Sequence, residues 1–134
     1  MDLYAENVLD HYRHPRNKTT LDDASVTREE KNWSCGDALA LSLKIEGQTI
    51  TEIGWAGEGC AVSQAAMSIL SESLPGRTLA DIDALTKKDI LELLAIPVGA
   101  RRMKCALLCL HTLKNALHAF RGEEEQDWSE TVGK

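Results

Sequence analysis

The chain opens with apolar side chains at helical spacing. Residues 3–13 carry one at every fourth position, which predicts a short amphipathic helix. These side chains are Tyr4, Val8 and Tyr12. Pro15 ends the predicted helix, because the residue before a proline avoids helical geometry. Residues 16–32 are polar, and this composition predicts a long loop.

A strand-like alternation follows the loop. Between residues 38 and 45, a leucine or isoleucine stands at every second position, which predicts a half-buried strand. Residues 46–48 read Glu-Gly-Gln and predict a turn. Residues 49–56 predict a second strand, so the two strands form a hairpin. Residues 25–34 carry a weaker signal for a third strand.

The second half of the chain has a helical period. Residues 60–73 predict a helix that a Pro-Gly pair ends. Two short helices are predicted at 79–85 and 87–95, because each start shows a threonine followed three residues later by an aspartate. The last helix is predicted over residues 100–121. Its expected buried side consists of Met103, Ala106, Leu107, Leu110, Leu113, Leu117 and Phe120.

This order of elements predicts an α+β fold, in which a small antiparallel sheet of about three strands has helices packed on one face. The length of 134 residues suits a single domain, which we expect to span residues 1–122. Residues 123–134 are acidic and nearly devoid of aliphatic side chains, which predicts a disordered tail.

Composition narrows the classes of partner. The chain has 15 basic and 21 acidic residues, and its net charge of −6 disfavours binding to nucleic acids. No stretch approaches the ~20 apolar residues of a membrane span. The first residues lack the basic and apolar regions of a secretory signal. We therefore expect no nucleic-acid or membrane partner and a cytoplasmic location, where cysteines stay reduced.

The cysteines carry the candidate chemistry. They are Cys35, Cys60, Cys105 and Cys109. The first three are separated by 25 and 45 residues, so any shared site is assembled by tertiary folding and is not a local CxxC zinc knuckle. Cys109 has leucine neighbours, and a buried core position is the simpler interpretation for it.

Local features favour thiolates at two of these positions and a shared ion at the third. Cys60 is predicted in the first turn of its helix, where free backbone N–H groups stabilise an anion. Cys105 follows Arg102 and Lys104, whose positive charge has the same effect. Asp37 lies two residues after Cys35, so in an extended segment both side chains can reach one ion.

Three thiolates and one carboxylate would form a tetrahedral site suited to zinc. The candidate ligands are Cys35, Asp37, Cys60 and Cys105. The carboxylate would be the exchangeable ligand, because zinc prefers sulfur in such a set. The four histidines have simpler interpretations: His11 and His14 as a solvated helix face, and His111 and His118 as surface or hydrogen-bonded residues. Arg101 and Arg102 are interpreted as an exposed pair at a helix start.

Four motifs stand in a fixed order along the chain. The first reads YAENVLDHYRHPRN, from Tyr4 to Asn17. The others read CGD from Cys35, GEGCAVS from Gly57 and RMKCA from Arg102. Together they resemble the IscU/SufU-type iron–sulfur cluster assembly proteins, which are related to the N-terminal part of the NifU scaffold. The resemblance covers residues 4–121.

The motif around Cys105 resembles the SufU branch of this family. The scaffold branch has a histidine immediately before the matching cysteine, where this chain has Lys104. The scaffold branch also carries a Leu-Pro-Pro-Val-Lys chaperone-recognition peptide, and residues 96–100 here read IPVGA. The stretch between Cys60 and Cys105 is shorter than in SufU-type proteins, which usually carry an insertion there.

The resemblance implies a function as well as a fold. SufU-type proteins bind zinc through residues that match Cys35, Asp37, Cys60 and Cys105. They accept persulfide sulfur from a PLP-dependent cysteine desulfurase, and Cys35 matches the expected acceptor. The resemblance therefore implies a zinc-bound sulfur carrier that serves downstream iron–sulfur assembly proteins, and a sulfurtransferase-like relay rather than a self-contained enzyme.

Two alternatives stay open at the level of the sequence. The same four residues would suit a scaffold on which Fe²⁺ and sulfide form a labile [2Fe–2S] cluster, because zinc and such a cluster favour similar thiolate sites. A structural zinc module for protein binding would also need these ligands. A zinc hydrolase is disfavoured, since thiolate ligands leave little Lewis acidity and no open position for water.

Overall fold

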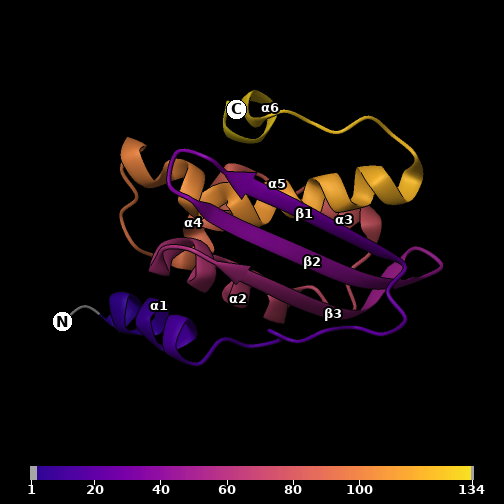
Figure 1. Ribbon diagram of the computed structural model, residues 1–134, viewed down its shortest axis with the longest axis horizontal. Coiled ribbons are helices and arrows are strands. Elements are labelled where there is room, and N and C mark those ends of the chain that lie inside the picture. The colour runs from indigo at the N-terminus through magenta and orange to yellow at the C-terminus, as the bar shows by residue number, and fades with distance from the viewer. Residues whose placement is uncertain (1–2, 134) are drawn as a thin grey trace.

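The sheet is a meander whose strand order follows the chain (Figure 1). In the computed structural model, which describes residues 3–133, three strands pair antiparallel in the order β1-β2-β3. Their bounds are Val26–Asn32 for β1, Asp37–Glu46 for β2 and Thr49–Glu58 for β3. The predicted α+β fold is confirmed, and the weak signal before residue 34 corresponds to a strand of its own.

Helices make up most of the remainder. They are α1 (Leu3–Arg13), α2 (Ala61–Ser73), α3 (Leu79–Asp83), α4 (Lys87–Leu94), α5 (Met103–Arg121) and α6 (Trp128–Val132), with a 3-10 turn η1 (Ala100–Arg102) before α5. A capping box begins α3, where the Thr78 hydroxyl accepts from Asp81 N and the Asp81 carboxylate accepts from Thr78 N. The predicted threonine–aspartate start signal is confirmed there.

The alternation in β2 separates a covered face of the sheet from an open one. Leu39, Leu41 and Leu43 are fully buried, whereas the residues between them are only half-buried. Helix α5 packs against β1 and β2, and α2 packs against β3 and α5. Helices α2 and α5 therefore cover the leucine face of the sheet, as predicted.

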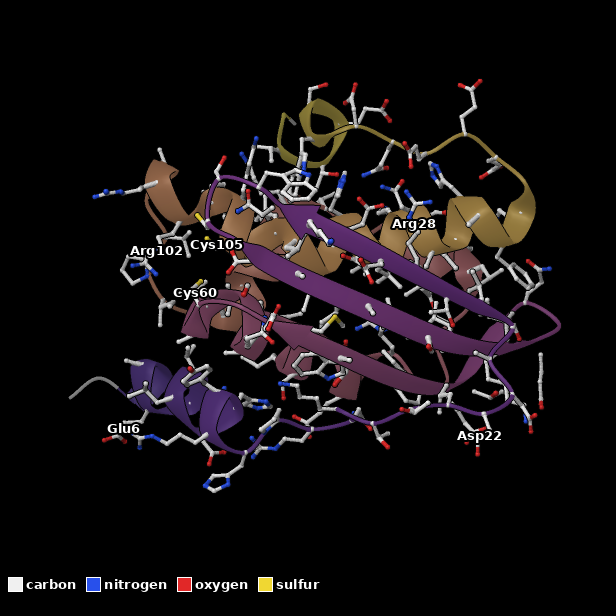
Figure 2. The ribbon with its side chains drawn as sticks, in the orientation of Figure 1. Glu6, Asp22, Arg28, Cys60, Arg102 and Cys105 are labelled. Carbon is white, nitrogen blue, oxygen red and sulfur yellow. The ribbon has the colours of Figure 1, made fainter. Side chains whose placement is uncertain are left out.

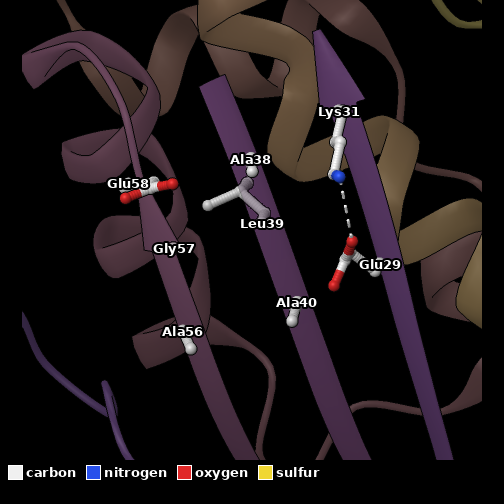
Figure 3. A pocket seen from close by; sticks show the side chains of 8 residues that line it. All are labelled: Glu29, Lys31, Ala38, Leu39, Ala40, Ala56, Gly57 and Glu58. Atoms are coloured by element: carbon white, nitrogen blue, oxygen red, sulfur yellow. Dashed lines mark ion pairs between the residues drawn. The ribbon is translucent and has the colours of Figure 1, made fainter. Parts of the chain in front are cut away.

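The opposite face of the sheet carries small side chains. Ala38, Ala40 and Ala56 line a shallow groove of about 430 Å³ on it (Figure 3). Lys31 and Glu29 form an ion pair at the groove edge, with 3.6 Å between Nζ and Oε1. Among the described residues no helix covers this groove.

Helix α5 runs through the core but leaves it at its last turn. Leu107, Leu110 and Leu113 are buried as predicted. Phe120 was expected on the same side and is 39% exposed, so that part of the prediction is wrong. Residues 118–121 contain no buried side chain, because this turn extends past the core.

Helix α1 packs against α2 through a histidine rather than the second tyrosine. Val8 and His11 are buried, whereas Tyr12 is 45% exposed; the side chain of Tyr4 lies outside the described part. The prediction of a solvated His11 is therefore wrong. Its Nδ1 lies 2.8 Å from the Ser68 hydroxyl, and a buried imidazole needs such a partner.

The loop after α1 is fixed along the free edge of β3. Trp55 N and Nε1 donate to the carbonyls of Asn17 and Arg16 at 3.0 and 2.8 Å. Arg16 N donates to the Ser68 hydroxyl, and Asn17 Nδ2 donates to the Ser71 hydroxyl. Local polarity predicted a loop here, and its partners come from β3 and α2.

The C-terminal segment differs from the predicted disordered tail. Trp128, the first residue of α6, stacks on His111 of α5 with 4.0 Å between ring centroids. Thr131 is buried, with its hydroxyl 2.8 Å from Nδ1 of His111. Gln126 N donates to Oδ1 of Asn115 at 2.8 Å. The partners that order residues 123–133 lie on α5, and the acidic composition of the segment itself could not reveal them.

No helix within residues 3–133 combines the length and apolar character that crossing a membrane would require.

The buried histidine of α1 makes stability depend on pH. Burial lowers the pKa of His11, an effect that Arg16 reinforces and that Glu72 and Asp10 oppose. The unfolded chain therefore binds protons more readily than the folded one below about pH 6.5, so stability falls as the pH drops below that value.

We expect His11→Leu to lower the free energy of unfolding by about 1–2 kcal/mol at pH 7.5, since Ser68 loses a buried hydrogen-bond partner. Between pH 7.5 and 5.5, the variant should lose less stability than the wild type. Urea unfolding followed by circular dichroism measures both effects. His14→Leu, at an exposed position, is the control, and equal losses in wild type and His11→Leu would contradict the assignment.

Candidate metal centre

Three segments far apart in the sequence meet at one end of the sheet. They are the turn that joins β1 to β2, the residues before α2, and the first turn of α5. Figure 2 labels Cys60, Arg102 and Cys105 together at this end of the molecule. A tertiary contact between distant segments, which the cysteine spacing required, is therefore present.

Asn32 holds the turn that carries Cys35. Its carbonyl accepts from Cys35 N at 3.2 Å and from Gly36 N at 2.9 Å. Its side chain is buried, and Oδ1 accepts from Ser34 N at 3.3 Å while Nδ2 lies 3.9 Å from the Cys105 sulfur. Sequence reasoning missed Asn32; the available signal was an asparagine that opens a tight turn ending in Cys-Gly.

Three of the four predicted ligands form a cluster. The ligand atoms of Cys35, Asp37 and Cys105 all lie within 4.8 Å of one another. The sulfurs of Cys35 and Cys105 are 3.4 Å apart, and both residues are free thiols. Cys35 is exposed, whereas Asp37 and Cys105 are each 1% exposed.

Asp37 uses one carboxylate oxygen and leaves the other without a partner. Oδ1 accepts from the backbone N–H of Cys60 at 2.8 Å. Oδ2 is buried and has no hydrogen-bond partner within the described residues. A buried carboxylate oxygen without a partner is costly, so this position calls for a cation or a proton.

Gly59 allows Asp37 to lie against the chain. Its φ is +141°, a conformation that residues with a side chain rarely adopt. A Cβ built there would lie 2.2 Å from Oδ1 and 2.9 Å from the Cα of Asp37. Any larger residue at 59 would therefore displace the carboxylate and the Cys60 amide together.

Cys60 lies beside the cluster and not within it. The predicted position in the first helical turn is off by one, because Cys60 is the N-cap of α2. Its sulfur is not among the three ligand atoms within 4.8 Å of one another. It lines the same hollow as Cys35 and Cys105, so the residue is near the place the sequence predicted.

Burial raises the pKa of the Cys105 thiol far above its usual range, and Asp37, Cys35 and Cys60 beside it raise it further. Each negative charge in this cluster of thiols and one carboxyl group makes it harder for the next group to lose its proton. A thiolate at Cys105 therefore requires a nearby cation.

The rim of the site is basic. A hollow of about 320 Å³ is lined by Ser34, Cys35, Cys60, Arg101, Arg102 and Cys105. Both arginines are exposed, as predicted. Lys104 was expected to favour a thiolate at Cys105, but its Nζ lies over Trp128 of α6, 5.5 Å from the ring centroid.

Cys109 is separate from this site. It is fully buried in the core cluster, and burial raises its pKa to about 12. The core interpretation of Cys109 is confirmed.

Residues 3–127 match the family described as NifU-like N terminal domain, so α6 follows the matched part. The zinc-dependent sulfurtransferase SufU of Bacillus subtilis is 29% identical over an alignment of 137 positions, gaps included. The alignment covers 90% of this chain and 92% of that protein. The iron-sulfur cluster assembly scaffold protein IscU of Thermotoga maritima is 32% identical over 131 residues, which cover 86% of this chain and 92% of its own length.

Solved structures agree with these relatives. A Fervidobacterium islandicum protein described as a scaffold for the SUF system superposes with a TM-score of 0.74 at 25% identity, and covers 84% of this chain and 94% of its own. A NifU-like N-terminal protein from Brucella abortus shares the fold, with a TM-score of 0.74 at 15% identity over 91% of this chain and 96% of its own. The chain belongs to the NifU-like N-terminal domain family, the IscU/SufU family of iron–sulfur cluster assembly proteins.

Proposed function

We propose that this protein is a zinc-bound sulfur carrier, which accepts persulfide sulfur from a cysteine desulfurase for iron–sulfur cluster assembly. The observation that carries the proposal is the unequal exposure of the clustered ligands. Cys35 is exposed, whereas Asp37 and Cys105 are buried behind it. Only one of the three clustered groups is therefore open to a large partner, and it is a nucleophile.

The residues present fit zinc. Their ligand atoms are close together, the set is rich in sulfur, and Oδ2 of Asp37 is buried without a partner. Cys35, Asp37 and Cys105 would hold the ion, and Cys60, on the same hollow, would supply the fourth ligand. Bound zinc keeps thiols deprotonated at neutral pH.

Sulfur transfer to Cys35 is a thiol–persulfide exchange. The Cys35 thiolate attacks the outer sulfur of the donor's persulfide. A bond forms between this sulfur and Sγ of Cys35, while the donor's own sulfur–sulfur bond breaks. The donor cysteine leaves as a thiolate, the proton of the persulfide stays on the transferred sulfur, and no external oxidant or reductant is needed.

The surrounding residues keep Cys35 in place for this step. Asn32 fixes the turn through two backbone hydrogen bonds. Asp37 joins the start of β2 to the residue before α2 through the Cys60 amide. Arg101 and Arg102 line the same hollow, so their positive charges lie on the side from which a partner approaches Cys35.

A scaffold for a [2Fe–2S] cluster is the second candidate. Relatives named IscU, 32% and 34% identical to this chain, favour it. Lys104 argues for the carrier, because it occupies the place before Cys105 where the scaffold branch carries a histidine. Anaerobic reconstitution with iron and sulfide, followed by transfer to an apo-ferredoxin, separates the two; we expect no transferable cluster.

Freshly purified protein should contain about one zinc per chain, as measured by plasma mass spectrometry. It should also take up radiolabelled sulfur from a cysteine desulfurase supplied with labelled cysteine. Cys35→Ala should abolish this uptake and leave the circular dichroism spectrum unchanged, because the residue is exposed. Cys109→Ala, at a buried cysteine outside the site, is the matched control. Undiminished uptake by Cys35→Ala would remove Cys35 from its role.

Gly59→Ala should weaken zinc binding at least about tenfold, since its Cβ displaces Asp37 and the Cys60 amide together. Competition with a chromophoric chelator measures the affinity. Gly99→Ala is the control, because a Cβ at residue 99 meets no atom within 4 Å. Wild-type affinity in a folded Gly59→Ala protein would show that Asp37 is not a ligand.

A further inference from the structure

An exposed tryptophan stands next to the site. Trp33 is 84% exposed, which is more than any other large apolar side chain in the part of the chain that the structure describes. Lys31 lies over the ring, with Nζ 5.2 Å from the ring centroid. Two residues further along lies Cys35, the proposed sulfur acceptor. Neither the core nor the ligand cluster uses this indole.

The turn displays Trp33 in a fixed place. The residue before it, Asn32, is buried and accepts hydrogen bonds from Ser34, Cys35 and Gly36. An aromatic side chain on a backbone held in this way loses little conformational freedom when a partner covers it. Tryptophan and arginine are the residue types most enriched in the binding hot spots of protein interfaces, and Ser34, next to Trp33 in the chain, lines the hollow together with Arg101 and Arg102.

The positive charge around the hollow indicates the charge that a partner surface should carry. The whole chain has a net charge of −6, yet Arg101 and Arg102 both line the hollow and are exposed. Lys31 adds a positive charge beside Trp33, and Glu29 is the acid paired with it. An acidic surface would complement this rim, whereas the remainder of the chain would repel it.

We propose that Trp33, Arg101 and Arg102 form the docking surface for the protein that donates sulfur. This inference rests on the proposed function. The partner presents its persulfide from an acidic surface that also contains an apolar recess for the indole. Trp33 anchors the contact, and the arginines orient the partner so that its persulfide enters the hollow toward Cys35.

A small persulfide molecule would not use this surface. The hollow of about 320 Å³ is lined by the arginines and the cysteines, and Trp33 lies outside that lining. A ligand confined to the hollow would leave the indole in water. A contact that includes both the hollow and Trp33 therefore requires a macromolecule.

The first test uses Trp33→Ala in the full-length, zinc-loaded chain. Calorimetric titration with the cysteine desulfurase of the source organism should show at least about a tenfold increase in Kd. The KM for sulfur transfer should rise in parallel, while kcat at saturation changes less than twofold. Trp33→Phe should recover part of the affinity. Phe120→Ala is the matched control, because it removes an exposed aromatic ring about 22 Å from Cys105 along α5.

The second test concerns charge. Arg101→Glu should weaken desulfurase binding and reduce the dependence of log Kd on salt concentration. Lys88→Glu on α4, at a side chain that is 84% exposed, is the control. An unchanged Kd in both Trp33→Ala and Arg101→Glu would overturn the docking surface.

Loading with sodium tetrasulfide separates this inference from the proposed function. Tetrasulfide reaches Cys35 without a docked protein, so Trp33→Ala should load at the wild-type rate. If Trp33→Ala loads slowly from tetrasulfide as well, the indole acts on the thiol itself and the docking surface is wrong. If the wild type binds the desulfurase through Trp33 but accepts no sulfur from it, the docking surface stands and the carrier function fails.

Discussion

The buried carboxylate of Asp37 is the constraint on which the site depends. One of its oxygens accepts from the amide of Cys60, and so links the first residue of β2 to the start of α2 across 23 residues of sequence. Its other oxygen is buried without a partner. Gly59 is needed because the carboxylate lies where a Cβ would be. A carboxylate held in this way is oriented before any cation arrives, which lowers the cost of binding one.

The two clustered sulfurs, those of Cys105 and Cys35, differ in how far they are exposed to solvent. Cys105 lies in the first turn of α5, where burial and acidic neighbours hold its pKa high in the absence of a cation. Cys35 lies 3.4 Å away on an exposed turn. A cation shared by the two would stabilise both thiolates, yet a partner could reach only one of them. This asymmetry favours a carrier whose acceptor is accessible and whose other ligands are protected.

The residues around the site also separate into an exposed group near Cys35 and a group that packs on α5. The turn that exposes Cys35 also exposes Trp33, and the arginines of η1 line the same hollow as Cys35. Lys104 is directed away to Trp128, which in turn stacks on His111. The C-terminal segment thereby packs on α5 close to Cys105 without covering the hollow, and the open end of the site stays available to a protein.

The sequence by itself determined the periodic elements and the identity of the reactive residues. Alternation in β2, the threonine–aspartate start of α3 and the motifs around Cys35, Cys60 and Cys105 are local signals, because each depends on neighbours within a few positions. Tertiary structure decided which side chains meet. It buried His11 against Ser68, ordered residues 123–133 on α5, turned Lys104 toward Trp128 and left Cys60 beside the cluster of Cys35, Asp37 and Cys105. Such contacts join residues up to 97 positions apart, as from Arg28 to Glu125, and no local pattern encodes the packing that brings them together.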